Sequence, residues 1–536
     1  MFKKIQSYFL FGREDKEFSR FSNNLLRIAS RSKVSNDGLC GKKILVDCSH
    51  LGYPKWNVKL MLIVANRIKN GAGEVHGFYP SRMFIWNSLK SFLIEVVKFV
   101  YNKDEKLSRS MGVARLMSIN LSDIRALLVA YKSAKAVRDG LRIKQDLLGL
   151  KIEGVHVGDL IYDNYLKWFR KPTVELRDLR LLVVLVVAFY FFRKFADLVE
   201  REHYSEVYLT HSVYIAFGIA ARVSLKNGAD VYVTQNTRGL FLQRLTNDHP
   251  HQTPRFEKYK ESFDSLPSED KTSAIFSARA RLQDRLSGKI DGSISYMRKS
   301  AYSSSERQPV ELVEYFPGKP YALIMLHCFF DSPHIYKWML FEDFYEWVVH
   351  CLTLLESKGF NVIVKAHPNG LDGNEAVVRA LQERFLKANF ISSGVSNNDI
   401  LGVRDVRVAL TVYGTVTHEF CYMGLPVINA GDNPHIAYSF SKTPRSLNDF
   451  DRALIDVMSG GGWGISKVEI EQFYYMNYMA EKPGYISFYD DVVEAGFSHV
   501  CGYQGIFDAL EGFSLERLDS NISKCLKDLE VVKDVV

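Results

Sequence analysis

Short apolar runs that alternate with helical patterns predict an α/β protein built on parallel sheets. Each run has the length of a buried strand, and the segment that follows repeats apolar residues at helical spacing. Because parallel strands need a crossover helix between them, this order is typical of βαβ units. The expected strands lie at 44–46, 207–209, 231–233, 321–326, 362–364, 390–391, 408–412 and 425–428. The expected helices lie at 57–69, 213–226, 270–288, 340–357, 374–389, 416–423 and 469–479.

The chain has 536 residues, more than one hydrophobic core usually serves, so at least two domains are expected. Residues 80–150 have a mostly helical pattern with a polar break at 102–110, and the polar composition of 240–317 favours a linker there. The pair His249-Pro250 follows no strand, so we expect a loop. The expected parts are a basic amphipathic arm (1–40), a Rossmann-like domain with a helical insertion and linker (41–317), a second Rossmann-like domain (318–480) and C-terminal helices that pack back (481–536).

Polar side chains follow the expected strands of the second domain at the point where each strand ends. His327, Asp331 and His334 follow the run at 321–326, and Lys365, His367 and Pro368 close the run at 362–364. In open parallel sheets, ligands bind beyond the carboxyl ends of the strands. We therefore expect these loops to meet the loop near 415 at one edge of a single sheet.

The turn at Gly414 and Thr415 joins the strand at 408–412 to a helix and predicts an anion site. The first amides of a helix lack partners within the helix, and the helix dipole is positive at that end. Thr415 can cap the helix, and Glu419, four residues later, shares its face and is suited to ribose hydroxyls. The alternative is a turn that only connects a strand to a helix, as in any α/β domain.

Histidines also follow two strands of the first domain. His50 comes after the run at 44–46, and His211 comes directly after the run at 207–209. Both positions lie where a parallel sheet opens to ligand, so His211 is a candidate for proton transfer and His50 for the lining of a cleft. For both, a core or capping histidine is the alternative.

The segments KAHP and VYGTVTHE…GLPVINAGDNPH resemble the C-terminal nucleotide-binding domain of GT-B glycosyltransferases of bacterial surface polysaccharide. The similarity is greatest to the capsule and O-antigen families that include Kdo transferases and polysialyltransferases. Residues 152–169 also resemble a stretch of surface carbohydrate biosynthesis proteins. The resemblance covers about 150–500 and implies a GT-B fold, in which two Rossmann-like domains face a central cleft.

The resemblance implies a nucleotide-sugar donor, most often CMP-activated, and we take CMP-Kdo or another CMP-ulosonic acid as the expected donor; UDP and GDP sugars and glycerol phosphate transfer remain open. The acceptor would be a growing surface polysaccharide or a lipid-linked oligosaccharide. Lys365 adds charge or forms a salt bridge, and Asp331 and His334 would flank the cleft. The family's His-Pro motif matches His367 and Pro368, and its Ser/Thr motif matches Thr415 or Thr417; the full set of expected donor-binding residues is Lys365, His367, Pro368, Gly414, Thr415, Thr417, His418, Glu419, Asn433 and His435.

Glycosyl transfer with inversion needs a carboxylate or imidazole to take the proton of the acceptor hydroxyl, and a retaining enzyme with a covalent intermediate needs a carboxylate nucleophile. Asp159 and Asp163 are four residues apart and would share a helix face. They are therefore catalytic candidates beside His211, although Asp159 is also suited to cap a helix that begins near Leu160.

Charge and composition narrow the setting. Residues 1–33 hold eight Lys/Arg against three Asp/Glu, a local net charge of +5, with aromatic residues between them. Such an arm suits either an anionic inner membrane or packing on its own domain. The apolar run at 181–192 is too short to span a bilayer, and the seven cysteines show no CxxC pair. A cytoplasmic protein with buried free thiols is expected, with no nucleic-acid partner.

No recognisable metal motif is present, so we expect a metal-independent enzyme without a cofactor, in which a helix dipole and basic side chains stabilise the leaving phosphate. Two alternatives come from other classes: a UDP-sugar 2-epimerase-like enzyme with the same two domains, and a catalytically inactive partner in polysaccharide assembly.

Overall fold

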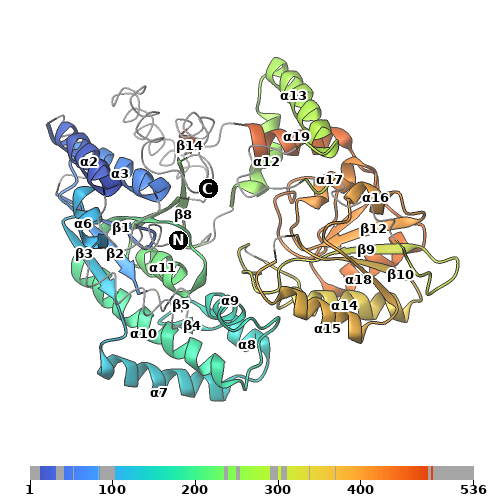
Figure 1. Cartoon of the computed structure of the whole chain (residues 1–536), viewed down its shortest axis with the longest axis horizontal. Helices are drawn as coiled ribbons and strands as arrows, with labels where there is room; N and C mark the ends of the chain where they lie inside the picture. The colour runs from blue at the N-terminus through green and yellow to red at the C-terminus, as the bar shows by residue number, and fades with distance from the viewer. Residues whose placement is uncertain are drawn as a thin grey trace.

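The computed structural model contains two α/β units, one for each half of the chain (Figure 1). Predictions for residues 1–12, His249-Pro250, Cys40, Cys501, Cys525 and 487–536 lie outside the described residues. The structure describes residues 13–31, 41–51, 54–81, 84, 103–234, 240–248, 254–289, 300–302, 311–336, 338–368, 370–480 and 485–486.

The first unit contains a seven-stranded sheet in the order β14-β8-β7-β6-β1-β2-β3. The five strands from β3 to β7 are parallel, and β8 and β14 add an antiparallel edge. This is the Rossmann-like order, in which the chain reverses direction across the sheet between β1 and β6. The strands are β1 (Lys43–Asp47), β2 (Glu74–Pro80), β3 (Arg115–Ile119), β6 (Tyr204–Leu209), β7 (Asp230–Thr234), β8 (Leu240–Leu245) and β14 (Tyr485–Ile486).

Side chains alternate between two apolar layers on the faces of this sheet, because successive residues of a strand point to opposite sides. Ile44 and Val46 join the layer under α2, α3 and α6, whereas Leu45 joins the layer under α7, α9, α10 and α11. The expected helical insertion is present between β3 and β6. The helices are α2 (Arg13–Arg31), α3 (Pro54–Lys69), α6 (Lys103–Ser110), α7 (Ile124–Gly140), α8 (Lys144–Leu148), α9 (Gly158–Phe169), α10 (Leu179–Glu202) and α11 (Ile219–Lys226), with a π-helix at Tyr214–Gly218 and a small hairpin of β4 (Lys151–Ile152) and β5 (Val155–His156).

The second unit contains a five-stranded, fully parallel sheet in the order β11-β10-β9-β12-β13. Every residue of the NVIVK strand β10 is buried, as expected for a parallel strand covered on both faces. The reversal of chain direction lies between β9 and β12. The strands are β9 (Tyr321–Met325), β10 (Asn361–Lys365), β11 (Ala388–Ile391), β12 (Val406–Thr411) and β13 (Val427–Asn429).

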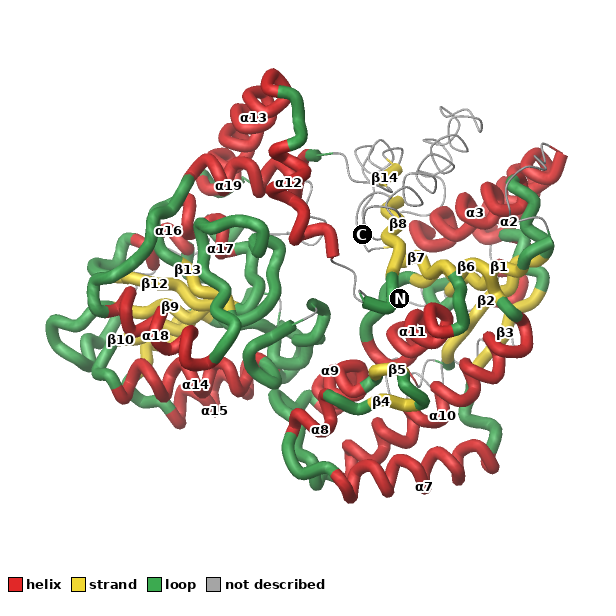
Figure 2. The backbone as a smooth tube through the Cα atoms, turned by 180° about the vertical axis from the view of Figure 1, so that it is seen from behind, coloured by secondary structure: helices red, strands yellow, loops and turns green. Residues whose placement is uncertain are grey.

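Helices cover both faces of the second sheet, as Figure 2 shows from behind. One face carries α14, α15 and α18, and the other carries α13, α16, α17 and α19. The expected α/β fold with two Rossmann-like domains, the architecture of GT-B proteins, is therefore confirmed. The helices are α12 (Tyr259–Asp264), α13 (Ser268–Leu286), α14 (Phe344–Ser357), α15 (Asn374–Arg384), α16 (Asn397–Leu401), α17 (Val416–Tyr422), α18 (Leu447–Met458) and α19 (Lys467–Tyr474), with a 3₁₀ turn at Pro254–Lys258 and a π-helix at Tyr475–Met479.

Three segments differ from the sequence-based expectation. Residues 103–110 form helix α6 rather than a polar break, and 115–119 form strand β3 within a stretch that was expected to be helical. Helices α12 and α13 pack on the second sheet instead of ending the first domain, because Ala278 and Leu282 join its apolar layer. The apolar stripe of α13 is small, so the polar composition of 240–317 predicted the end of the first domain and a linker instead.

Helix α2, within the expected basic arm, packs on its own domain. Phe18 is buried against the layer that contains α3, and Asp15 accepts an ion pair from Lys103 of α6 at 2.9 Å. The sequence left two alternatives for this arm, an anionic membrane or its own domain, and the described part packs on its own domain. Helix α10, which contains the apolar run at 181–192, is also a packed helix, and none of the described helices combines the length and hydropathy needed to cross a bilayer.

Helix α9 joins the two units through buried polar contacts. The hydroxyl of Tyr162 donates to Asp343 Oδ2 at 2.5 Å, and Asp343 also caps helix α14 by accepting from the backbone of Glu346. The residue that follows Tyr162, Asp163, places its Oδ1 2.6 Å from His334 Nδ1. Since Asp343 is fully buried, both units exclude water from this contact.

A buried ion pair secures helix α13 to the second domain. Glu419 accepts from Arg285 Nε at 2.7 Å and from the Tyr302 hydroxyl at 2.7 Å, and its side chain is almost inaccessible. Replacing Glu419 by Ala would remove the carboxylate that pairs with the buried guanidinium of Arg285. We expect a loss of about 3–5 kcal/mol in the free energy of unfolding, measured by urea denaturation.

The matched control is Glu105→Ala, which removes an exposed i,i+4 pair with Arg109. That change should cost no more than about 0.5 kcal/mol. An equally small loss for Glu419→Ala would contradict a stabilising role for the buried pair.

Candidate functional site

The carboxyl ends of β9, β10 and β12 lie at one edge of the second sheet. β9 is the parallel neighbour of both other strands, so the loops at 326–334, 366–370 and 412–415 start side by side. This is the spatial arrangement that the sequence predicted for these three loops. The edge also contains the point where the chain reverses direction, which is where α/β sheets bind ligands.

His327 connects the two central strands at this edge. Its Nε2 accepts from the Thr411 hydroxyl at 3.0 Å and from the Val412 amide at 3.2 Å, and its ring stacks on Phe344 at 4.6 Å. Burial, with the nearby His367, lowers the pKa of His327 to about 3. Through one backbone and one side-chain hydrogen bond, the neutral, packed ring of His327 positions the ends of β9 and β12. Its place is therefore a structural one, whereas the sequence predicted that His327 lines the cleft.

Asp331 is the exposed acid of this edge. Its Oδ1 accepts from the hydroxyl of Tyr214, which belongs to the first domain, at 3.2 Å. Burial lowers the pKa of the half-buried His367, and the charge of Asp331 opposes that shift. Burial also raises the pKa of Tyr413, and Asp331 adds to that rise. Asp331 therefore influences the protonation of groups that follow two strands of the second sheet, β10 and β12.

Lys167 and Tyr214 are functional candidates that the sequence did not single out. Lys167 of α9 places its Nζ 3.6 Å from the centre of the Tyr214 ring, within cation–π distance. Burial lowers the pKa of Lys167 to about 8, against the opposing charge of Asp331. Tyr214 has a positive φ of 63° at the start of a π-helix, two features that recur at functional sites. The HSVY segment after β6 holds no sequence signal for this conformation.

Asp163 and His334 form an acid–histidine pair between the domains. Burial raises the pKa of Asp163 to about 6, with His334 acting in the opposite direction. The pKa of His334 is raised as well, because the charge and hydrogen bond of Asp163 outweigh the effect of burial. The other ring nitrogen of His334, Nε2, is buried and has no hydrogen-bond partner among the described residues. The pair can therefore accept a further hydrogen bond at Nε2.

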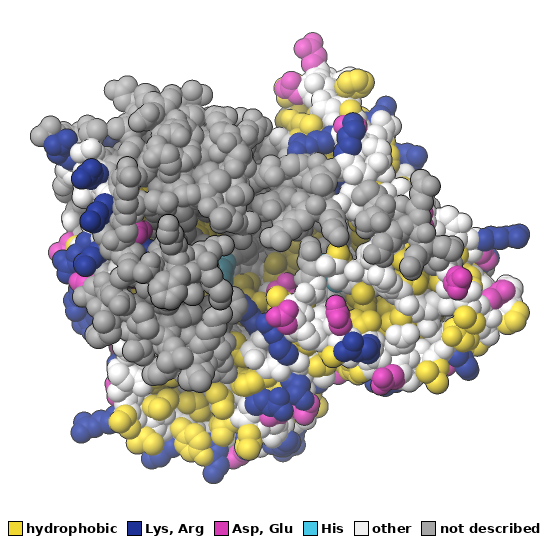
Figure 3. All heavy atoms as spheres, in the orientation of Figure 1, with side chains coloured by type: hydrophobic (Ala, Val, Ile, Leu, Met, Phe, Trp, Pro, Cys, Tyr) yellow, Lys and Arg dark blue, Asp and Glu magenta, His cyan; other side chains and the backbone are white. Residues whose placement is uncertain are grey.

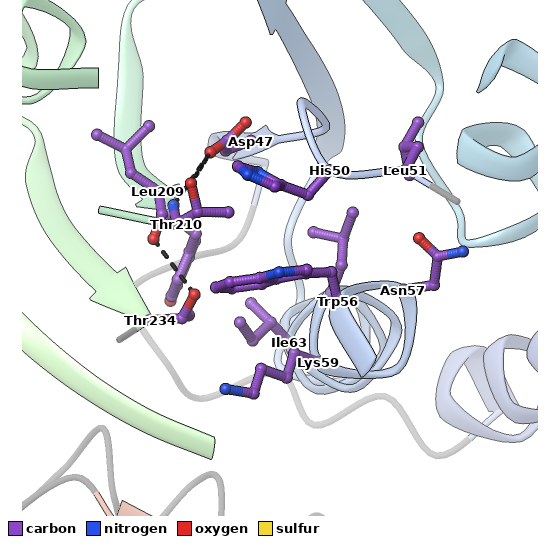
Figure 4. A pocket seen from close by; sticks show the side chains of 12 residues that line it. Asp47, His50, Leu51, Trp56, Asn57, Lys59, Ile63, Leu209, Thr210 and Thr234 are labelled. Carbon is purple, nitrogen blue, oxygen red and sulfur yellow. Dashed lines mark hydrogen bonds between the residues drawn. The ribbon is translucent and has the colours of Figure 1, made fainter. Parts of the chain in front are cut away.

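The first domain has a pocket beyond the ends of β1 and β6 (Figure 4). Asp47 Oδ2 accepts from the Thr210 hydroxyl at 2.6 Å and so joins the two strand ends. The rings of His50 and Trp56 lie 5.4 Å apart and form one wall, and Lys59 Nζ lies 5.1 Å from the Trp56 ring. The pocket thus combines an aromatic wall with a cation at the point where this sheet reverses direction.

His211 lies beside this pocket and packs on Phe217, with ring centres 4.0 Å apart. Burial, with the charges of His50 and Lys167, lowers the pKa of His211 well below its usual value. Its Nδ1 is buried without a hydrogen-bond partner in the described part of the chain. His50 and His211, each expected where the sheet opens, have ring centres 6.3 Å apart.

Asp159 does not accompany Asp163 at the domain contact. Arg222 of α11 donates to both of its carboxylate oxygens at 2.6 Å, and the pair is buried within the first domain. The two aspartates belong to one helix, but this ion pair leaves Asp159 no free oxygen for chemistry. Its expected catalytic role is therefore replaced by a structural one.

The expected anion site at the start of α17 also differs. Thr415 makes no side-chain cap, and α17 has only seven residues, so its dipole is weak. Gly414 is required by packing, because an added Cβ would lie 2.7 Å from the Thr411 hydroxyl oxygen. Thr417 is buried and donates to Asn429 at 2.7 Å. Of the expected ligands in this motif, Gly414 and Thr415 keep partial exposure beside the edge, whereas Thr417 and Glu419 are buried.

Two other expected donor ligands, Lys365 and Glu419, are buried on the face of the second sheet that carries α13, α16, α17 and α19. Lys365 is buried and donates to Asn397 at 2.5 Å, and burial lowers its pKa to about 8. Glu419 is committed to Arg285 and Tyr302, so the expectation that it binds ribose is wrong in this geometry. Lys365 still belongs to β10 and shares the face of Ile363, where Asn397 of α16 binds it, whereas the residues that follow have left the strand.

His418 and His435 form a buried pair, with Nδ1 of His418 3.0 Å from Nε2 of His435. Asn433 accepts from the His435 amide at 3.0 Å, and all three side chains are inaccessible. Their expected role in binding the sugar is not supported by this burial. His367 and Pro368 remain partly or fully exposed at the edge, as expected.

No group of three His, Cys, Asp or Glu side chains among the described residues has the geometry of a metal site. The described cysteines, Cys48, Cys328, Cys351 and Cys421, are buried free thiols.

The contacts described above bring six polar groups together between the domains. They are Asp163, Lys167, Tyr214, Asp331, His334 and His367.

Comparison with known proteins gives only distant similarities. No family model and no curated protein matches the chain. Among solved structures, the KpsC β-Kdo 2,4-transferase of Thermosulfurimonas dismutans shares 14% identity over 51% of this chain and 80% of its own, with a TM-score of 0.32. The UDP-GlcNAc 2-epimerase of Neisseria meningitidis, solved with UDP-GlcNAc, shares 10% identity over 87% of this chain and 100% of its own, with a TM-score of 0.22. Similarities this weak carry no functional argument, so the fold assignment rests on the strand orders.

The buried histidine pair predicts acid sensitivity. Burial lowers the pKa of His435 to about 3 and lowers the pKa of His418 well below its usual value. The unfolded chain therefore binds protons that the folded chain does not, and the contribution to stability is complete above about pH 6.5 and declines below it. The free energy of unfolding should fall by about 1.4 kcal/mol per pH unit for each such histidine below that pH.

Urea denaturation of His435→Gln between about pH 6.5 and pH 5 should show a slope that is smaller by about this amount. The exposed His203 has a left-handed backbone that Asn tolerates, so His203→Asn serves as the control and should leave the slope unchanged. An unchanged slope in His435→Gln would contradict the assignment.

Proposed function

We propose that the protein is a glycosyltransferase that moves a sugar from a nucleotide-activated donor to a surface polysaccharide or lipid-linked acceptor. The observation that carries the proposal is the position of polar groups from both domains beyond the carboxyl edges of two Rossmann-like sheets. Tyr214 and Asp163 of the first domain reach Asp331 and His334 of the second. A transferase needs such an arrangement, because donor and acceptor must be held within reach of each other.

The donor would bind at the edge of the second sheet. His367 and Pro368 match the family's His-Pro motif. Thr415 or Thr417 matches its Ser/Thr motif, and of these two Thr415 retains exposure, next to Gly414. Lys167 would provide positive charge for the phosphate that leaves, and the neutral His367 would donate a hydrogen bond to it, an arrangement that needs no metal. A CMP-activated ulosonic acid such as CMP-Kdo is the proposed donor, on the resemblance of these motifs.

The acceptor would bind at the first domain. The pocket beside His50 has the aromatic Trp56 and the cationic Lys59, and both suit an acidic oligosaccharide. The two reacting molecules would then lie on opposite sides of the contact between the domains. We propose that the enzyme acts in the cytoplasm at the inner membrane, where a lipid-linked acceptor is exposed.

The proton of the acceptor hydroxyl would be taken by His334 through its unpartnered Nε2. Asp163 would hold the ring by its hydrogen bond to Nδ1 and stabilise the imidazolium that forms. His211, a neutral imidazole beside the acceptor pocket, is the second candidate for this step. Asp163 thus acts as a positioning residue in place of the direct role that the sequence predicted.

A thermal-shift screen against CMP, UDP, GDP and CDP tests the donor site. CMP should raise the melting temperature of the wild-type protein, because a ligand that binds only the folded state stabilises it. His367→Ala should abolish the shift, whereas the exposed-site control His203→Asn should retain it. The absence of a shift with any nucleotide, or a shift unaffected by His367→Ala, would contradict the proposed site.

Kinetics with the donor so identified and an oligosaccharide acceptor test the proposed base. His334→Gln should lower kcat by about 100-fold to 10,000-fold. Asp163→Asn should lower kcat less and move the acidic limb of the pH–rate profile to lower pH, because the charge of Asp163 raises the pKa of His334.

An unchanged kcat in His334→Gln would shift the role to His211. Turnover of UDP-GlcNAc without an acceptor would instead identify an epimerase and overturn the transferase proposal.

A further inference from the structure

The helical insertion of the first domain exposes a continuous set of large apolar side chains. On α7, Ile124 is 71% exposed and Leu128 is 58% exposed, and on α10, Leu179 is 71% exposed and Val183 is 47% exposed. Exposed apolar residues that occur singly need no explanation, but a group on neighbouring elements marks an interaction surface. Figure 3 shows apolar side chains gathered over this part of the molecule, with Lys and Arg beside them.

The two helices lie side by side and antiparallel. Arg177, just before α10, donates to the carbonyl of Arg138 near the end of α7, and Lys194 pairs with Asp123 at the start of α7. On the inner side of α7, Ala130 and Ala134 are buried, and Leu127 and Val137 pack against the same apolar layer. Ile124 and Leu128 remain exposed.

Basic side chains flank this apolar face. Residues 121–144 contain six Lys/Arg and two Asp, a net charge of +4. Arg125, Lys132 and Lys135 are exposed and form no ion pair with any described residue. An apolar stripe with unpaired cations beside it is the pattern of a helix that lies in the interface of an anionic bilayer.

We propose that the α7–α10 face, defined by Ile124, Leu128, Leu179 and Val183 with Arg125, Lys132 and Lys135, docks on an anionic lipid surface. A second copy of the chain fits the face less well, because a two-fold contact would place the same excess of positive charge on both sides. Anionic headgroups neutralise that charge while the apolar side chains enter the region beneath them. This docking does not depend on the proposed transferase activity.

Sedimentation of the full chain with vesicles tests the docking. Vesicles of phosphatidylcholine with about 30% phosphatidylglycerol should bind the wild-type protein, and pure phosphatidylcholine vesicles should bind it much more weakly. Lys132→Gln with Lys135→Gln should lower the partition coefficient about 30-fold, since each cation near such a surface contributes about fivefold. Ile124→Ser with Leu128→Ser should also lower it by at least tenfold, at an unchanged circular dichroism spectrum.

The matched control is Phe276→Ser with Leu386→Ser, which changes two side chains that are each 72% exposed but lie on the second domain. That variant should bind vesicles like the wild type. Equal binding by all variants would overturn the proposal. So would analytical ultracentrifugation that shows a dimer dissociated by Ile124→Ser with Leu128→Ser, because the face would then be an interface between copies.

Discussion

The contact between helix α9 and the loop after β9 is the constraint on which the candidate site depends. Asp163 and Tyr162 of α9 form buried hydrogen bonds to His334 and Asp343, which belong to the other domain. Buried charged and polar groups are costly unless they are paired, so neither domain can bury this contact alone without a loss of stability. The same requirement brings the edges of the two sheets toward each other and sets Tyr214 against Asp331.

Both domains use the same principle at their chain-reversal points, with different outcomes. In the first, Asp47 bridges the ends of β1 and β6 and leaves a pocket beside His50. In the second, His327 bridges β9 and β12 and fills the space between them. The open polar groups of the second domain therefore lie further out, in the loops that contain Asp331 and His367. A sheet edge can thus be closed by one side chain while its loops stay available.

Several candidates that are close in the sequence have separate roles in the structure, because each meets a different partner. Lys365 and His367 are two residues apart, yet Lys365 lies in the strand and points to the face that carries α13, whereas His367 lies in the loop at the edge. Asp159 and Asp163 share a helix, but Arg222 binds the first and His334 the second. In each case the partner comes from a distant segment, so nearness in the sequence did not imply a shared role.

The sequence by itself determined the two Rossmann-like domains and the loops that meet at one sheet edge, because apolar periodicity and strand ends are local properties. It also indicated His367 and Pro368 at that edge. Only the tertiary structure decided that Glu419, His418 and Asn433 are interior residues, and that Lys167 and Tyr214 join the site. The reason is physical: burial and pairing depend on partners such as Arg285 and Asp331, which lie more than one hundred residues away in the chain.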